Sequence, residues 1–376
     1  MAGIYLHIPF CKQACHYCNF HFSTSLRKKT EMVGALLREI DLRNGYLSDR
    51  ELKSIYLGGG TPSLLTLSEL DQLFERMGRY FTIHPEAEIT LEANPDDLSK
   101  EYLSELAQSP VNRLSIGVQS FFAEDLVFMN RAHTADEADR CIRLAQDAGF
   151  DNLSIDLIYG SPTTPLANWI KNLEQSIALE VPHLSTYALT VEPQTALAHF
   201  VAKGKVPAPK DAQMEEQFYE MLDRLERADF EHYEISNWAK PGHYAVHNTS
   251  YWQGVPYLGI GPSAHSYDGR SRQWNIANNA RYMADLAENQ VPAEREEIDP
   301  VTAYNEYVLT RMRTQWGCEL ANINPAYQAH FLQNLQPFLK RGEVLEGPDQ
   351  TYRLSRSGKL LADHIASELF FLENEE

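Results

Sequence analysis

Positive charge is scarce in this sequence, and long apolar runs are missing. The 376 residues carry 33 lysines and arginines against 52 aspartates and glutamates, which gives a formal net charge of −19. Such an acidic chain has no general attraction to nucleic acid or anionic lipid, so we exclude both as bulk partners. No stretch approaches the ~18 apolar residues that would span a bilayer, and residues 1–10 lack the basic and apolar regions of a signal peptide. We therefore expect a cytoplasmic protein without stable membrane insertion.

Cysteine is also scarce, and its distribution is uneven. The chain has five cysteines, and three of them, Cys11, Cys15 and Cys18, lie close together near the start. A disulfide framework would spread cysteines through a small secreted chain. The clustering predicts a metal site instead, whereas the isolated Cys141 and Cys318 are expected to pack as small apolar side chains.

Strand-like and helical stretches alternate over the first two thirds of the chain. Strands are expected at Ile4–Ile8, Ser54–Leu57, Glu88–Leu91, Arg113–Gly117, Asn152–Ile158 and His183–Ala188. Helices are expected at Glu31–Arg43, Ser68–Tyr80, Ser99–Gln108, Ala135–Asp147, Pro165–Leu179 and Asp211–Ala228, the second beginning with a capping box of Ser68 and Asp71. This alternation predicts an α/β fold of parallel βαβ units. Because no Rossmann glycine fingerprint is present, a TIM-like barrel or a partial one is favoured.

The remainder of the chain is organised differently. Residues 233–279 are rich in Trp, Tyr, Asn, His and Gly and predict long ordered loops. The tail predicts helices at Thr302–Thr314, Pro325–Leu335 and Gly358–Phe371, with a hairpin of Glu343–Leu345 and Tyr352–Leu354 before the last one. We therefore expect a barrel over 1–235, a loop-rich extension over 236–300 and a small winged-helix-like α+β domain over 301–376.

The Cys11-x3-Cys15-x2-Cys18 run, directly after the first expected strand, carries the strongest chemical signal. Thiolates bind the irons of Fe–S clusters, and four usually close a cubane. Three neighbouring cysteines would leave one iron open to a further ligand, as catalytic zinc sites leave a position open. Two alternatives stay open on spacing alone: a zinc site completed by His16 or His21, or three buried cysteines.

Polar or glycine-rich segments stand at the ends of several expected strands. Gly58-Gly59-Gly60-Thr61-Pro62 follows the second strand, where glycines allow a ligand to approach the backbone; a tight βα turn would explain them equally. Single polar residues close the next three strands: Glu92, Gln119 and Asp156. One such residue is usually a helix cap or a satisfied core group. Three together predict a ring of ligand contacts, because the carboxyl ends of barrel strands face the active site.

Taken together, these motifs resemble the radical S-adenosylmethionine (SAM) superfamily. Within it, the sequence is similar to the group that contains oxygen-independent coproporphyrinogen III oxidase and the HemW-type heme chaperones. The resemblance runs over nearly the whole chain and includes Tyr5–Cys11, the cysteine run, the glycine loop, Gly117–Phe121, Asp156–Gly160 and Gly259–His265. It implies a partial (βα)6 barrel, a [4Fe–4S] cluster on Cys11, Cys15 and Cys18, and SAM chelated to the open iron by its amino and carboxylate groups. In this family, an electron from the reduced cluster cleaves SAM to a 5′-deoxyadenosyl radical.

The resemblance also implies roles for individual residues. Tyr5 and Tyr17 would lie beside the cluster and SAM. Gly59, Gly60 and Thr61 would contact the methionine part of SAM, and Glu92, Gln119, Arg131 and Asp156 its polar groups. The planar fork of Arg131 suits a carboxylate, although a helix-surface arginine is the more ordinary interpretation.

Three features distinguish the members of this group. The oxidase carries a fourth cysteine where this chain has Phe20, and a long segment before the cluster, where this chain has ten residues. His247-Asn-Thr-Ser-Tyr251-Trp252 is similar to the H-N-x-x-Y-W motif that is associated with heme in HemW-type proteins. Imidazole is a common axial ligand of heme iron, and the two aromatic rings could flank a macrocycle. His247 could equally order a loop, and we expect His265 to be structural.

The leading hypothesis is therefore a heme chaperone that delivers heme to acceptor proteins such as respiratory enzymes. The cluster and SAM would serve regulation or release, and an electron donor would reduce the cluster. Two enzymatic alternatives remain: a porphyrinogen-decarboxylating oxidase, which Phe20 and the short N-terminal segment disfavour, and a radical SAM methyltransferase.

Overall fold

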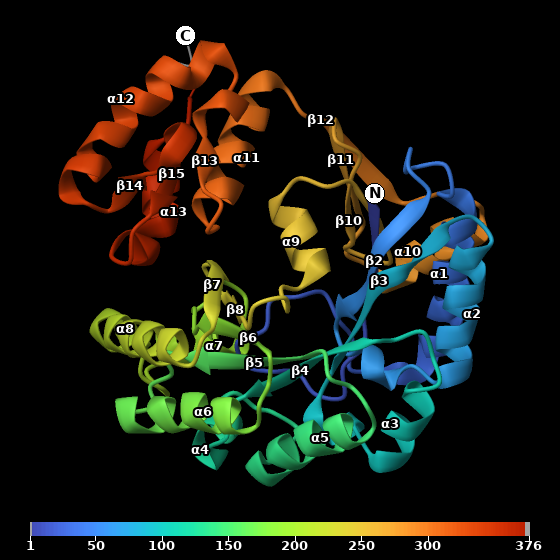
Figure 1. The fold of residues 1–376 in the computed structure, drawn as a ribbon. Coiled ribbons are helices and arrows are strands. Elements are labelled where there is room, and N and C mark those ends of the chain that lie inside the picture. The colour runs from blue at the N-terminus through green and yellow to red at the C-terminus, as the bar shows by residue number, and fades with distance from the viewer. Residues whose placement is uncertain (1, 373–376) are drawn as a thin grey trace.

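The computed structural model describes residues 2–372, and its centre is a row of six parallel strands (Figure 1). The strands are β1 (Ala2–Ile8), β2 (Glu51–Gly59), β3 (Thr82–Ala93), β4 (Arg113–Gln119), β5 (Leu153–Tyr159) and β6 (His183–Ala188). They pair in sequence order, each parallel to the next. This order confirms the partial (βα)6 architecture expected from the sequence.

Helices follow each of these strands, and most of them cover the outside of the sheet (Figure 1). They are α1 (Lys29–Leu42), α2 (Leu67–Gly78), α3 (Lys100–Leu106), α4 (Ala123–Phe128), α5 (Ala135–Asp147), α6 (Leu166–Ala178), α7 (Ala196–Ala202) and α8 (Asp211–Arg227). The expected start of α2 was wrong by two residues. Its N-cap is Thr66, whose hydroxyl accepts from the Glu69 amide while the Glu69 carboxylate accepts from the Thr66 amide. Thr66, and not Ser68, is the N-cap because Glu69 follows three residues later. Its side chain reaches back to the Thr66 amide and completes the second hydrogen bond of the capping box.

Residues 233–279 differ most from expectation, because short strands and a helix replace the long loops. They form β7 (Glu231–Glu234), β8 (Asn237–Ala239), α9 (Val246–Trp252), β9 (Tyr257–Ile260), β10 (His265–Tyr267) and β11 (Ser271–Asn275), followed by α10 (Asn279–Ala287) and β12 (Ala293–Glu297). Strand β9 runs parallel to β1, β10 to β12 continue antiparallel beyond it, and β8 pairs with β6 at the other edge. Strands of three to five residues leave too short a pattern to be recognised in sequence, and the free edges of β1 and β6 determine where they pair.

The C-terminal part has a core of its own. It contains α11 (Pro300–Met312), β13 (Cys318–Glu319), α12 (Pro325–Arg341), β14 (Val344–Glu346), β15 (Thr351–Leu354) and α13 (Ala362–Glu368). Strands β13, β15 and β14 form a separate antiparallel sheet, and Val308, Phe331 and Ile365 are fully buried between it and the helices. Both expected strands of the hairpin are present. Within residues 2–372, none of the helices has the length and apolar character needed to cross a bilayer.

Candidate functional site

A cavity of about 740 Å³ opens on the inner side of the central sheet. Side chains from all six parallel strands line it, together with residues of α9 and of the β9–β11 segment. Four of the expected site residues meet there: Tyr5, Glu92, Asp156 and His247. The structure therefore places the two acids that were expected to contact SAM and the histidine that was expected to contact heme around one space.

Two carboxyl groups face this cavity from neighbouring parts of the sheet. Glu92 accepts hydrogen bonds from the Tyr56 hydroxyl at 2.7 Å and from the Gly59 amide at 3.2 Å. Burial, with a smaller contribution from the negative charge of Asp156, raises the pKa of Glu92 to about 7. Burial likewise raises the pKa of Asp156 to about 6, against hydrogen bonds from Ser185 and Ser115. The pair is only partly ionised near neutral pH, so a cationic or hydrogen-bond-donating ligand would be stabilised between them.

Arg131 marks a second group of expected site residues, next to the cysteines. Its Nη1 lies 3.2 Å from Cys15 Sγ, and its Nη2 donates to Asn94 Oδ1 and to the Gly117 carbonyl, both at 2.6 Å. Its Nε is buried without a partner in the described part of the chain. Burial alone would lower the pKa of Arg131, but Tyr17 and Cys15 raise it above the ordinary value. Arg131 is thus not a helix-surface residue: its charge is directed inward, toward Cys15.

The three cysteines lie in the loop after β1, and each thiol is partly accessible. Burial raises the pKa of Cys11 to about 11, whereas a hydrogen bond with Thr61 and the charge of Arg131 oppose this shift. Among residues 2–372, no three His, Cys, Asp or Glu side chains converge as they would around a single ion. A cubane does not require such convergence, because its thiolates bind different irons. The three cysteines of this loop, with Arg131 beside Cys15, would fit a group that is held by three thiolates.

The two histidines considered as zinc ligands make other contacts. His16 Nδ1 bonds the Phe128 carbonyl at 2.9 Å, and His21 Nε2 bonds Asn279 Oδ1 at 2.7 Å. Each imidazole is therefore oriented by a partner outside the cysteine loop.

The glycine loop packs the cysteine segment against the sheet. Gly59 has φ of 101°, and a Cβ there would come within 2.4 Å of His7 Nδ1. A Cβ on Gly60 would approach the Phe10 carbonyl oxygen to 2.6 Å. Thr61, which is buried, accepts from Asn94 Nδ2 at 3.1 Å. Close packing within the protein thus explains why Gly59 and Gly60 are glycines, whether or not a ligand also approaches the loop.

Gln119 stands at the end of β4 in a left-handed conformation, with φ of 64°. The register between β4 and β5 shifts just before it, between Ile116 and Gln119. A Cβ on Gly117 would meet both Gln119 Nε2 and Arg131 Nη2 at 3.0 Å, so these two side chains lie together. The irregular strand end directs the Gln119 amide toward the Arg131 group.

His247 lies in the first turn of α9 and faces the cavity. Its Nδ1 and Ser54 Oγ are 2.9 Å apart, and its ring stacks on Tyr56 with centroids 5.2 Å apart. Its Nε2 makes no hydrogen bond within the described residues. Burial, with Arg113 adding to it, lowers the pKa of His247 to about 4, so the imidazole is neutral at physiological pH. A neutral ring with one nitrogen anchored and the other free is what a metal requires of a histidine ligand.

Glu88, on β3, was not anticipated as part of the site. Its carboxylate accepts from the amides of Val246 and His247 at 2.9 and 3.0 Å, which caps the start of α9. It also forms an ion pair with Arg113, whose Nε is 3.7 Å away. The sequence Glu88-Ile89-Thr90-Leu91-Glu92 could have indicated this role. Every second residue of a strand faces the same side, so Glu88 shares a face with Glu92.

The aromatic residues of the same motif have separate surroundings. Tyr251 is 48% exposed and lines the cavity. Trp252 instead lies under Arg313 of the C-terminal part, with Cζ 5.7 Å from the ring centroid. Only Tyr251 is thus placed to flank a cavity ligand.

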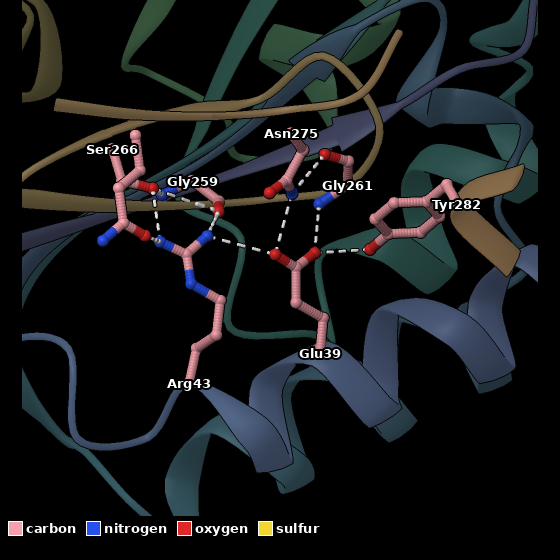
Figure 2. Close-up of polar contacts among 8 residues, drawn as sticks. Glu39, Arg43, Gly259, Gly261, Ser266, Asn275 and Tyr282 are labelled. Carbon is pink, nitrogen blue, oxygen red and sulfur yellow. Dashed lines mark hydrogen bonds and ion pairs between the residues drawn. The ribbon is translucent and has the colours of Figure 1, made fainter. Parts of the chain in front are cut away.

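A buried polar cluster fixes the segment that carries His265 (Figure 2). Glu39 of α1 accepts from the amide of Gly261 at 2.8 Å and from Asn275 Nδ2 at 2.7 Å. Arg43 pairs with Glu39 and donates to the Gly259 carbonyl at 2.9 Å. The β9–β11 segment is thereby attached to α1 through groups that are shielded from water. His265, expected to be structural, has an exposed ring that lines the cavity.

Comparisons with known proteins show the family to which this chain belongs. Residues 5–174 match the model of the radical SAM superfamily. The heme chaperone HemW of Mycobacterium tuberculosis is 34% identical over 98% of this chain and 94% of its own length, and that of Escherichia coli is 34% identical over 99% and 98%. HemW of Bacillus subtilis is 31% identical over 97% and 98%.

Among solved structures, coproporphyrinogen III oxidase of Escherichia coli superposes with a TM-score of 0.85 at 23% identity, covering 98% of this chain and 90% of that one. At this identity, the likeness concerns the fold alone. The sequence relatives are closer and cover nearly the full length. The chain therefore belongs to the HemW family of the radical SAM superfamily.

Proposed function

We propose that this protein is a heme chaperone, which binds heme with His247 as an iron ligand and passes it to heme-accepting proteins such as respiratory enzymes. The observation that carries the proposal is the state of His247. Its imidazole is neutral, its Nδ1 is engaged by Ser54, its Nε2 has no hydrogen-bond partner among residues 2–372, and the residue lines the cavity. Imidazole in this state is the common protein ligand of heme iron.

The cavity is suited to a flat, largely apolar ligand with a polar edge. Its volume of about 740 Å³ is within the range of ordinary small-molecule sites, about 300–1,000 Å³. Tyr5, Tyr56 and Tyr251 provide aromatic walls around His247. Phe20, which is 68% exposed, lines the same space where the oxidase would carry a fourth cysteine. The position thus supplies an apolar contact and no thiol, which supports the chaperone over the oxidase.

The same proposal assigns a [4Fe–4S] cluster to Cys11, Cys15 and Cys18 and SAM to the space beside it. Arg131 would hold a carboxylate, and Glu92 and Asp156 would hold groups that donate hydrogen bonds. Tyr5, Tyr17, Gly59, Gly60, Thr61 and Gln119 complete the proposed set of contacts. When bound, the reduced cluster would supply an electron to SAM, which requires a protein electron donor. We assign this chemistry to the regulation or release of heme.

The relatives support the proposed chaperone function, because those that match over nearly their whole length carry the name heme chaperone. A cytoplasmic location is part of the proposal, since clustered thiols that bind iron persist in reducing compartments.

The deciding experiment is a titration of anaerobically prepared protein with hemin, followed by Soret absorbance. We expect saturable binding by the wild type and a weaker, spectrally altered complex for His247→Ala. His364→Ala, which removes an exposed histidine of α13, is the matched control and should bind as the wild type does. Absence of saturable binding by the wild type would refute the chaperone proposal. Assays of porphyrinogen decarboxylation and of labelled methyl transfer from SAM would then test the enzymatic alternatives.

A further inference from the structure

The cavity contains two arginines, and only one of them is available to a ligand. Arg113 is 2% exposed and is engaged by Glu88 and, at 3.5 Å, by Thr90 Oγ1. Arg272, on β11, has a side chain that is 37% exposed. In a chain of net charge −19, an accessible arginine in a cavity identifies where a negative group of a ligand would be stabilised.

Arg272 lies on one face of the β10–β11 hairpin. It stands opposite Tyr267, and His265 stands opposite Trp274 in the same ladder. Such cross-strand pairs share a face when they are two residues apart along the strand. Both His265 and Arg272 line the cavity, so this face of the hairpin forms one of its walls. The hydrogen bonds of the Glu39–Arg43 cluster attach this segment to α1 (Figure 2).

The present partner of Arg272 is Glu306 of α11, in the C-terminal part. The closest atoms of this ion pair, Arg272 Nη2 and Glu306 Oε2, are 2.8 Å apart. Burial raises the pKa of Glu306, Arg272 opposes this, and Glu296 and Asp299 raise it further. Glu306 therefore stands among other acids and is a replaceable partner. A guanidinium can bind a ligand carboxylate by two parallel hydrogen bonds, which is the stronger arrangement.

We propose that Arg272 binds a propionate carboxylate of the porphyrin, which replaces Glu306. This inference rests on the proposed function and deepens it: His247 selects the metal, and Arg272 selects the acidic edge of the macrocycle. Carboxylate exchange also breaks the ion pair that links the cavity wall to α11. Occupancy of the cavity is thereby signalled to the C-terminal part of the chain.

The test compares hemin with its dimethyl ester, which has the same iron and ring but no free carboxylate, in the same detergent. Arg272→Gln should bind hemin about tenfold more weakly, equivalent to about 1.4 kcal/mol, and the ester as the wild type does. Glu306→Gln removes the competing carboxylate and should bind hemin several-fold more tightly. Arg295→Gln changes the net charge equally on the adjacent strand, where Arg295 pairs with Glu297, and should leave both affinities unchanged.

The outcomes separate this inference from the proposed function. If Arg272→Gln binds hemin like the wild type, or loses hemin and ester equally, then Arg272 is not a carboxylate site, although heme binding itself stands. If Glu306→Gln weakens hemin binding, the exchange is refuted. If the wild type binds neither ligand saturably, both the inference and the chaperone proposal fail. Thermal unfolding of each variant verifies that the fold is retained.

Discussion

Ser54 of β2 and His247 of α9 are joined by a hydrogen bond of 2.9 Å between side chains 193 residues apart in the chain. The bond fixes Nδ1 of an imidazole that lines the cavity and leaves Nε2 without a hydrogen-bond partner among residues 2–372. Ser54 is 1% exposed, so its hydroxyl is held in the sheet rather than hydrated. The orientation of the proposed heme ligand is thus set by a strand of the barrel and not only by its own helix.

Replacement of Ser54 should therefore weaken heme binding without removing the ligand. In Ser54→Ala, His247 loses the partner of Nδ1, and we expect hemin affinity to fall about three- to tenfold, as for the loss of one hydrogen bond of roughly 1 kcal/mol. Hemin titration followed by Soret absorbance measures the change. Ser176→Ala removes a buried hydroxyl that bonds the Asn172 carbonyl in α6, away from the cavity, and serves as the control. Equal affinities for wild type and Ser54→Ala would contradict the assigned role.

Removal of a single cysteine should separate cluster ligands from packing residues. We expect Cys15→Ser, after anaerobic reconstitution, to lose most of its iron, sulfide and visible absorbance, because two thiolates hold a cubane poorly. Cys141→Ser changes a thiol that is buried in α5, bonded to the Ala138 carbonyl, and should retain the wild-type iron content. Iron and sulfide analysis of both proteins checks this. A Cys15→Ser protein with full iron content would refute the cluster assignment.

The raised pKa of Glu92 predicts a specific pH dependence of stability. Because the folded-state pKa of about 7 exceeds the ordinary glutamate value of 4.5, the folded state binds more protons between these values, and stability falls as pH rises through this window. Glu92→Gln removes this loss. It should be more stable than the wild type at pH 8 by about 1–2 kcal/mol, allowing for water in the cavity, and similar to it at pH 5.

Urea unfolding of cluster-free wild-type and Glu92→Gln proteins at the two pH values measures the effect. Comparing the two proteins cancels the titration of groups that do not interact with Glu92. The assignment is wrong if the stability difference between them is the same at pH 5 and pH 8.

Neutralising Glu39 should be costly, because it leaves Arg43 without its buried partner. The two side chains are 0% and 5% exposed, and Tyr282 and Asn275 also bond the Glu39 carboxylate. Breaking such a buried pair from one side costs about 3–5 kcal/mol, so Glu39→Gln should lower the urea midpoint strongly. Glu31→Gln, at an exposed position of the same helix, should change it little. A Glu39→Gln midpoint equal to that of the wild type would show that the cluster of Figure 2 contributes no net stability.

Local patterns determined much of the fold. The helix expected at Ala135–Asp147 has those bounds in the structure, and each of the six expected strands overlaps a parallel strand of the barrel, although β2 and β3 are longer than expected. This succeeded because hydrophobic periodicity is a local property of ten or so residues. The cysteine motif was equally visible, because its three ligands are close in sequence.

Tertiary structure decided what depends on residues distant in sequence. Strands β9 to β11 were expected as loops, and they exist because β1 offers a free edge for pairing. Glu88, Ser54 and His247 come from three different elements. Their spacing in the sequence does not predict that the Glu88 carboxylate caps α9 or that the Ser54 hydroxyl bonds the imidazole. Arg272 and Glu306 likewise meet only because α11 packs beside the hairpin. The sequence determined which chemical groups are present and which elements carry them, whereas their convergence on one cavity is a property of the folded chain, because only folding brings such distant side chains within bonding distance.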